Sequence, residues 1–204
     1  MGRAMTEISL KNLLVTTLTR PREGAHAIIA LNLSTQVLWM ALALISITMS
    51  AIVSGLFHLM PIPDPATAEL VQSMLFYSAP IGFALLNLGN AVLSIFVLFW
   101  SGRLFGGTGD MRDVLSVIVL FQGTVITLLV GIAIISMLLP SLSGFIFVVF
   151  AVWVIWAMIS VIHVAHRFDS IAKSIAVFLM VTFVVPFGLS VIIGVISAPF
   201  IGAP

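Results

Sequence analysis

Four long stretches of the 204-residue chain contain no Asp, Glu, Lys or Arg. They run for 40 residues after Glu23, 33 after Glu69, 53 after Asp113 and 31 after Lys173. A helix needs about 20 apolar residues to cross the hydrocarbon core of a bilayer, so each stretch can span a membrane at least once. Only 7% of the side chains are charged, against about a quarter in soluble domains. We therefore predict an all-α, polytopic integral membrane protein.

The 53-residue stretch is long enough for two spans, and it contains a run typical of a tight turn, PSLSG at residues 140–144. The sequence thus predicts five transmembrane helices. They are expected near residues 34–58, 79–101, 113–138, 144–166 and 173–197. The chain divides into an N-terminal segment, residues 1–33, and a five-helix transmembrane domain, residues 34–204.

The basic residues all fall on one side of this layout. They precede the first helix (Arg3, Lys11, Arg20 and Arg22) or lie in the loops after the second and fourth helices (Arg103, Arg112, Arg167 and Lys173). Cytoplasmic loops carry an excess of Lys and Arg. We therefore expect a cytoplasmic N-terminus and an external C-terminus, which is periplasmic in a bacterial inner membrane.

The N-terminal segment has the pattern of an amphipathic helix at the membrane interface. Ile8, Leu14, Val15 and Leu18 recur near helical spacing, and Pro21 restarts the chain. A loosely ordered tail is the alternative, and the surface helix is favoured over it.

Several residues predict where helices begin or bend. Asp64 and Pro65 are expected to start a short helix that ends at Tyr77, before a bend near Pro80. Further along, Asp110 is expected to cap the third span, with Asp113 in its first turn, and Pro186 is expected to kink the fifth.

Polar side chains inside a membrane are costly and are functional candidates by default. Here they form one candidate cluster in the second and third spans: Asn87, Asn90, Gln122, Thr124 and Thr127. If those spans fold back on each other, Asn90 comes level with Thr124 and Asn87 with Thr127. Hydrogen bonding between the two helices is the favoured interpretation, and a polar path through the bundle is the alternative.

Stripes of small residues allow helices to approach closely. Such stripes occur in the third span at Gly123, Thr127 and Gly131, in the first at Ser46, Ser50 and Ser54, and in the fifth at Ser190, Gly194 and Ala198. We expect each to be a buried seam. The stripes of the first and fifth spans would be dimer contacts if they faced lipid.

Composition and motifs exclude several kinds of chemistry. A net charge of +1 without clustered basic residues argues against nucleic-acid binding, and the absence of Cys excludes thiolate chemistry. His163 and His166 are one helical turn apart with Asp169 nearby, but two histidines do not make a zinc site, and capping of a helix end is the favoured role. The glycine-rich loop after the second span lacks the Lys-Ser/Thr ending of a phosphate-binding loop. We therefore expect neither a cofactor nor a metal.

Three short motifs resemble those of the Yip (Ypt-interacting protein) domain family, in its bacterial branch. They are FGGTGDM at 105–111, TRPRE at 19–23 and HRFDS at 166–170, and the likeness runs from about residue 17 to 196. The resemblance implies five helices, a cytoplasmic N-terminus and no catalytic residue. Within the motif loops, the candidate contact residues are Arg103, Gly106, Gly107, Gly109, His166 and Arg167. Eukaryotic relatives bind Rab-type GTPases, but this chain lacks their long polar N-terminal segment and DLYGP motif, which argues against that partner.

These features favour a non-enzymatic scaffold, assembly partner or membrane organiser whose partners are the lipid bilayer and other membrane proteins or a second copy of itself. A small transporter or channel that uses the polar cluster, with Pro186 as a hinge, is the alternative. A metalloenzyme built on His163 and His166 is a third hypothesis.

Overall fold

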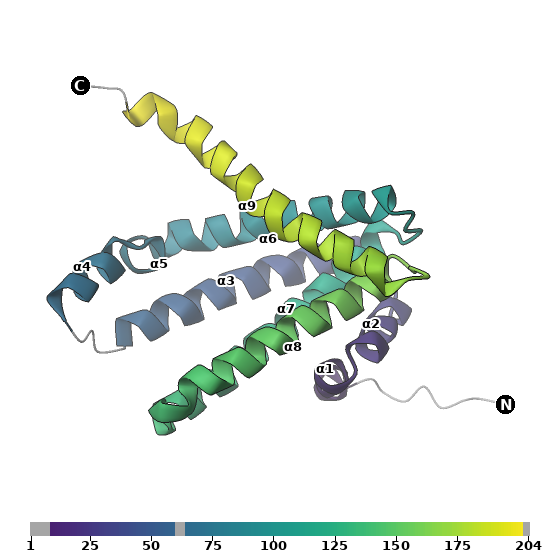
Figure 1. The fold of residues 1–204 in the computed structure, drawn as a ribbon, viewed down its shortest axis with the longest axis horizontal. Coiled ribbons are helices and arrows are strands. Elements are labelled where there is room, and N and C mark those ends of the chain that lie inside the picture. Colours follow the sequence, from purple (N-terminus) through teal and green to yellow (C-terminus); the bar gives the residue numbers. More distant parts are fainter. Residues whose placement is uncertain (1–8, 60–63, 202–204) are drawn as a thin grey trace.

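The computed structural model describes residues 9–59 and 64–201 (Figure 1). Within these ranges the chain is helical and contains no strand. The elements are α1 (Leu10–Thr19), α2 (Pro21–Ala30), α3 (Thr35–Leu59), α4 (Pro65–Ser73), α5 (Leu75–Ser78), α6 (Pro80–Leu104), α7 (Met111–Leu138), a 3₁₀ turn (Pro140–Leu142), α8 (Ser143–Ala165) and α9 (Ile171–Ile201).

Five of these helices, α3, α6, α7, α8 and α9, are long and apolar enough to cross a membrane. They coincide with the five predicted spans, and most of their ends lie within two or three residues of the predicted ones. The PSLSG run forms the 3₁₀ turn and the start of α8, as expected of a tight hairpin. The predicted fold class is confirmed.

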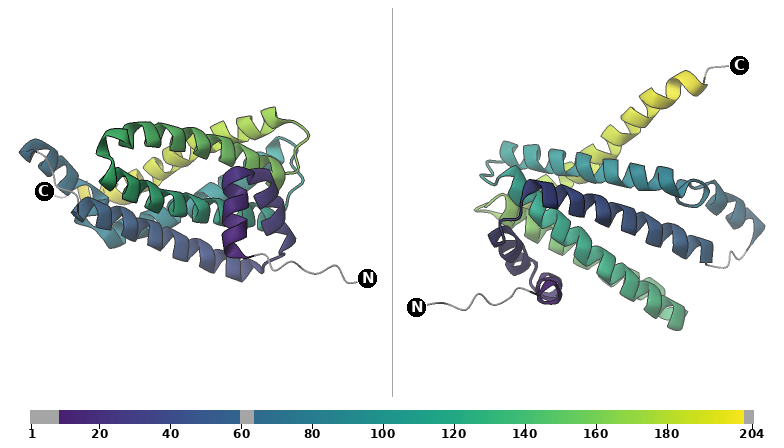
Figure 2. Two further views of the ribbon diagram at one scale, coloured as in Figure 1. Left: turned by 90° about the horizontal axis from the view of Figure 1, so that it is seen from below. Right: turned by 180° about the vertical axis from the view of Figure 1, so that it is seen from behind.

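The five long helices are packed at one end of the molecule and diverge toward the other (Figures 1 and 2). Helix α3 contacts both α6 and α7, while α9 packs on α6 and α8. Burial follows this shape. On α7 every residue from 113 to 121 is buried, whereas residues 137–139 are exposed.

The packed end is also the basic end. The loops from α6 to α7 and from α8 to α9 meet there, beside α1 and α2 (Figure 1). These elements and the adjoining ends of α6, α7 and α9 carry all the basic residues that the structure describes. Helix α4, with Asp64 and Glu69, lies at the opposite end. The sorting of charge predicted from the sequence is thus retained in three dimensions.

Helices α1 and α2 form a hairpin that packs on α7 and α8. Thr17 is fully buried against Gly24, where an added Cβ would lie less than 3.0 Å from Thr17. The indole Nε1 of Trp153 on α8 donates a hydrogen bond to the Leu18 carbonyl at 2.9 Å. The N-terminal segment from Leu10 onward is therefore a docked hairpin, and a loosely ordered tail is wrong for these residues.

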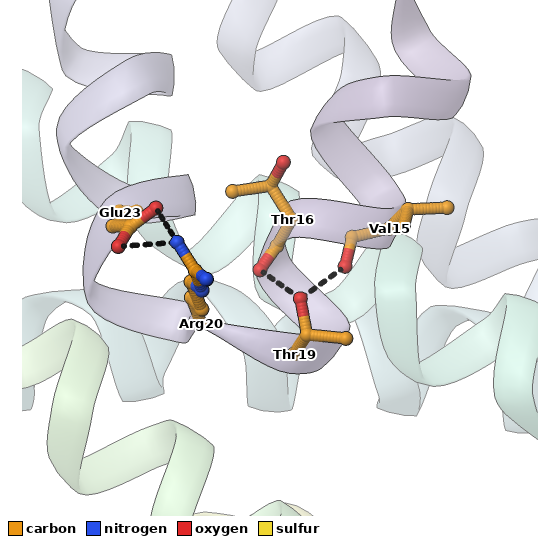
Figure 3. Close-up of polar contacts among 5 residues, drawn as sticks. All are labelled: Val15, Thr16, Thr19, Arg20 and Glu23. Atoms are coloured by element: carbon orange, nitrogen blue, oxygen red, sulfur yellow. Dashed lines mark hydrogen bonds and ion pairs between the residues drawn. The ribbon is translucent and has the colours of Figure 1, made fainter.

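The turn of the hairpin lies between Thr19 and Pro21 (Figure 3). Thr19 Oγ1 donates to the Val15 carbonyl at 3.0 Å, and the exposed Arg20 pairs with Glu23 at 3.3 Å. Helix α1 runs across the direction of the spans (Figure 2), as a helix in the membrane plane would.

The face of α1 differs in part from the predicted one. Leu13 and Thr17 point into the bundle, while Leu10 and Val15 are 70% and 52% exposed. Of the apolar side chains chosen from the sequence, Val15 is exposed, whereas Leu14 and Leu18 are partly buried. Ile8 lies outside the described residues.

The predicted helix starts are largely confirmed. Asp64 caps α4 by accepting a hydrogen bond from Thr67 N at 2.9 Å, and the chain breaks again at Ala79, just before Pro80. Asp110 stands at the N-cap of α7, but its side chain makes no capping bond. Helix α9 continues through Pro186, so the kink there stays a prediction.

One predicted seam is wrong. Ser190 and Gly194 on α9 are exposed because α9 diverges from the bundle in this region (Figure 1). The side chain of Ala198 lies outside the described set. The alternative predicted from the sequence, a dimer contact on a lipid-facing surface, is therefore the interpretation that remains for this stripe.

Candidate functional site

Two loops interlock at the packed end and form what we call the loop junction, residues 102–110 and 165–169. The first loop turns at Gly106, whose φ of +81° is a conformation that glycine adopts at little cost. It then runs back toward the second loop, where Thr108 N–H donates to the His166 carbonyl at 3.0 Å. The backbone after α6 is in this way bonded to the turn after α8.

The imidazole of His166 fills the space that glycines leave open, and it is 0% exposed. An added Cβ on Gly102 would lie less than 3.0 Å from the ring, and one on Gly107 would lie 2.9 Å from the His166 Cβ. A Cβ on Gly109 would overlap the backbone just before His166. Gly107 N–H also donates to the Gly102 carbonyl at 2.8 Å. Glycine is required at these positions because the two loops are in van der Waals contact there.

The ring of His166 is held mainly by packing. Neither of its nitrogens has a partner among the described residues, and its closest aromatic neighbour is Phe168, with 5.3 Å between ring centroids. Burial lowers the pKa of His166 from 6.5 to about 4, and the charge of Arg103 acts in the same direction. The nearby Leu98 carbonyl opposes this shift. At neutral pH the buried ring is uncharged, which is the form that burial favours.

Acidification is therefore expected to destabilise the folded chain between pH 6.5 and about pH 4. In this window unfolded His166 binds a proton and folded His166 does not, so stability falls by about 1.4 kcal/mol for each pH unit lowered. Thermal melting in detergent across this range measures the effect. The dependence should persist in His26→Gln, which removes an exposed histidine, and should be much weaker in His166→Asn, where the partly buried His163 still contributes. The same pH dependence in both variants would contradict the assignment.

The turn after α8 ends the helix with a Schellman motif. Arg167 has a φ of 53°, its N–H donates to the Val164 carbonyl at 3.1 Å, and Phe168 N–H donates to the His163 carbonyl at 3.1 Å. Arg167 also pairs with Asp113 on α7 at 2.8 Å, where the Asp113 side chain is 12% exposed. This ion pair joins the second loop to the first turn of α7 and opposes the cost of a left-handed backbone at a residue other than glycine.

His163 on α8 and His166 just after it do not face a common point. His163 Nδ1 lies 3.2 Å from the Ser174 hydroxyl on α9, whereas His166 is enclosed in the loop junction. Asp169 pairs with Lys173 at 2.7 Å. Within the described ranges, no group of three or more His, Cys, Asp or Glu side chains gathers in a way that could hold a metal.

One member of the predicted polar cluster, Asn87, is hydrogen-bonded to α3. Asn87 on α6 donates to the Ser46 carbonyl at 3.1 Å and to the Ser50 hydroxyl at 3.2 Å. Ser46, Ser50 and Ser54 are all at most 5% exposed. The predicted seam along the first span is confirmed, and its partner is α6.

The predicted pairing of the second and third spans is wrong. Thr124 and Thr127 each bond a carbonyl of their own helix at 2.9 Å, and Thr127 is exposed. Helices α6 and α7 diverge from their shared loop, and α3 contacts both. The residue pairs expected to be level in a simple hairpin of these two helices therefore do not meet. Asn90 accepts a bond from Ser94 through its backbone carbonyl. The stripe on α7 is not a tight seam either, since a Cβ on Gly131 would meet nothing within 4 Å.

The structure does bring Asn87 and Gln122 to one small cavity of about 150 Å³ between α3, α6 and α7. Its other lining residues are mostly apolar, including Ile45, Met49 and Val125. It has the size of a few water molecules.

Two structural roles were missed in the sequence. Gly102 belongs to the loop junction, as do Gly106, Gly107 and Gly109, which were chosen from the sequence. Its place in the same glycine-rich run, one helical turn before Gly106, could have identified it. Asp113 was assigned to the helix dipole, yet it pairs with Arg167, 54 residues away. Of the other contact candidates, Arg103 is exposed, with its guanidinium 5.3 Å from the centroid of the Phe99 ring.

Comparison with known proteins gives a match that covers the regions described above. A family model described as the Yip1 domain matches residues 15–192, which include α2, both loops of the loop junction and most of all five spans. No match is found among curated proteins or among solved structures.

Proposed function

Because this chain belongs to the Yip1 domain family, we propose that it is a non-enzymatic membrane protein that acts by contact, as a scaffold, an assembly partner or an organiser of the bilayer. The observation that carries the proposal is the use of the intramembrane polar groups for packing. The amide nitrogen of Asn87 donates two hydrogen bonds, both to α3. Such bonds stabilise a bundle by holding two spans together.

The outer face of the docked hairpin is a surface through which the protein could make such contacts. Helix α1 lies across the spans at the basic end, with Leu10 and Val15 on its outer face (Figure 2). Exposed apolar side chains next to basic ones suit the headgroup region of a bilayer or a second membrane protein.

We further propose a bacterial inner membrane as the location, with the N-terminus cytoplasmic and the C-terminus periplasmic. The gathering of Lys and Arg at the packed end supports this orientation through the positive-inside rule. The motifs of residues 105–111 and 166–170 support the bacterial branch. GTPase binding is not part of the proposal.

A small transporter or channel remains the second candidate, because Asn87 and Gln122 share a cavity. Cysteine labelling separates the two functions, since the chain has no native Cys. Under the contact role, Gln122→Cys and Val125→Cys in native membranes should resist a charged, membrane-impermeant thiol reagent.

Two further variants serve as positive and negative controls for the labelling. Arg112→Cys, exposed at the basic end, should be labelled from the cytoplasmic face only, and Ile134→Cys, exposed within a span, should not be labelled at all. Labelling of both cavity positions from one face would show a water-filled path and would replace the contact role with transport.

A further inference from the structure

A groove of about 460 Å³ opens at the basic end, between the turn of the α1–α2 hairpin, α8 and α9. Its rim is polar and includes Arg20, Arg22 and Glu23. Its floor comes from two membrane spans and is mainly apolar. Because the rim lies at the ends of the spans and the floor continues along them, the groove runs from the interface toward the hydrocarbon region.

The rim presents positive charge that is free to bind. The side chain of Arg22 makes no hydrogen bond or ion pair with the described residues. Arg20 pairs with Glu23 at 3.3 Å, but these side chains are 70% and 59% exposed (Figure 3). An exposed pair of this kind contributes little to stability, so a stronger ligand can displace it. Two guanidinium groups and one carboxylate leave a net charge of +1, which matches one phosphodiester.

The floor presents exposed apolar side chains and one hydroxyl, from a residue that is otherwise buried. Trp156 is 48% exposed, and Ile171 and Ile175 are 47% and 40% exposed. Ser160 also lines the groove and is 3% exposed, yet its hydroxyl has no hydrogen-bond partner in the described part of the chain. A hydroxyl on the wall of an otherwise apolar groove can donate to an acceptor from a ligand or a water molecule.

We propose that this groove binds one anionic glycerophospholipid of the leaflet at the basic end. The phosphate binds Arg22 and Arg20, since guanidinium groups match phosphate oxygens in charge and geometry. An acyl chain lies along Trp156 and Ile175, and the Ser160 hydroxyl donates to an ester carbonyl between the two regions. Basic pockets between spans on the cytoplasmic side suit anionic headgroups for the same reasons. The proposal does not depend on whether the protein is a scaffold or a transporter.

The test is native mass spectrometry of the full chain, purified in detergent and exposed to equal amounts of phosphatidylglycerol and phosphatidylethanolamine. We expect one tightly bound phosphatidylglycerol per chain. Arg22→Gln should weaken this binding about tenfold, the effect of losing a charged hydrogen bond. Lys11→Gln makes the same charge change on α1 away from the groove and should leave the affinity unchanged.

A second pair of variants tests the floor without changing charge. Ile175→Trp fills the groove and should displace the lipid, whereas Leu179→Trp, one turn further along α9 and also exposed, should not. Equal loss in Arg22→Gln and Lys11→Gln would overturn the proposal, as would equal binding of the two lipids or full occupancy in Ile175→Trp.

Discussion

Gly109→Ala is expected to destabilise the bundle by about 3 kcal/mol or more, which is large for the addition of one methyl group. The Cβ would overlap the Ala165 carbonyl oxygen, and that backbone atom belongs to the last turn of α8. It cannot move without separating the two loops, which would also stretch the bond from Thr108 N–H to the His166 carbonyl. Thermal melting of the purified protein in mild detergent measures the loss.

Gly131→Ala is the matched control for this prediction. It lies in α7, the helix that Gly109 precedes, and a Cβ there meets nothing within 4 Å. Replacing an open helical glycine by alanine normally raises helix stability by up to about 1 kcal/mol. Similar melting temperatures for Gly109→Ala and the native chain would show that the loops are not in contact as described.

Gly102→Ala is expected to have the second large effect on stability, and its sign is opposite to the one that helix propensity alone would give. Gly102 lies near the end of α6, where alanine should favour the helix by about 1 kcal/mol. We instead expect a loss of about 2 to 3 kcal/mol, because the new Cβ would collide with the His166 ring.

The collision can be tested by removing its other partner. His166→Ala alone should be destabilising because it leaves a cavity, but adding Gly102→Ala to it should then cost little. A coupling free energy of about 1 kcal/mol or more between the two substitutions would establish the contact. Additive effects in the double variant would contradict it.

These predictions concern the part of the molecule that could least be predicted from the sequence. The spans were predictable because an uncharged stretch must be long enough to cross the bilayer and because the Pro140 turn interrupts the longest one. The side carrying the basic residues was predictable for similar local reasons. None of this information specifies which helices are neighbours.

The errors have a common physical origin. Asn87 was paired with Thr127 on the assumption that consecutive spans lie side by side, but its amide bonds α3, because the buried serines of α3 offer acceptors close to it. Ser190 and Gly194 were expected in a seam, but α9 diverges from the bundle before reaching them. Helix partners depend on tertiary packing, which a local pattern does not record.

The candidate contact residues all lie in the loop junction, but the contact between its two loops was not predicted. The glycine run and the HRFDS motif were chosen as separate loops, and the structure joins them through His166. Its burial was not predictable, since a histidine at a helix end is ordinarily exposed as a C-terminal cap. Only the fold shows that Gly102 and Gly107 lie against the ring.

The most direct test of the contact role is extraction of tagged protein from its native membrane into lipid discs, followed by mass spectrometry of everything retained in stoichiometric amount. A membrane protein of similar size, extracted in parallel, controls for background. A scaffold or assembly partner is expected to retain a recurring stoichiometric protein partner or a second copy of the chain. A single bare chain, alone or with a small solute bound, would contradict this expectation and would favour transport.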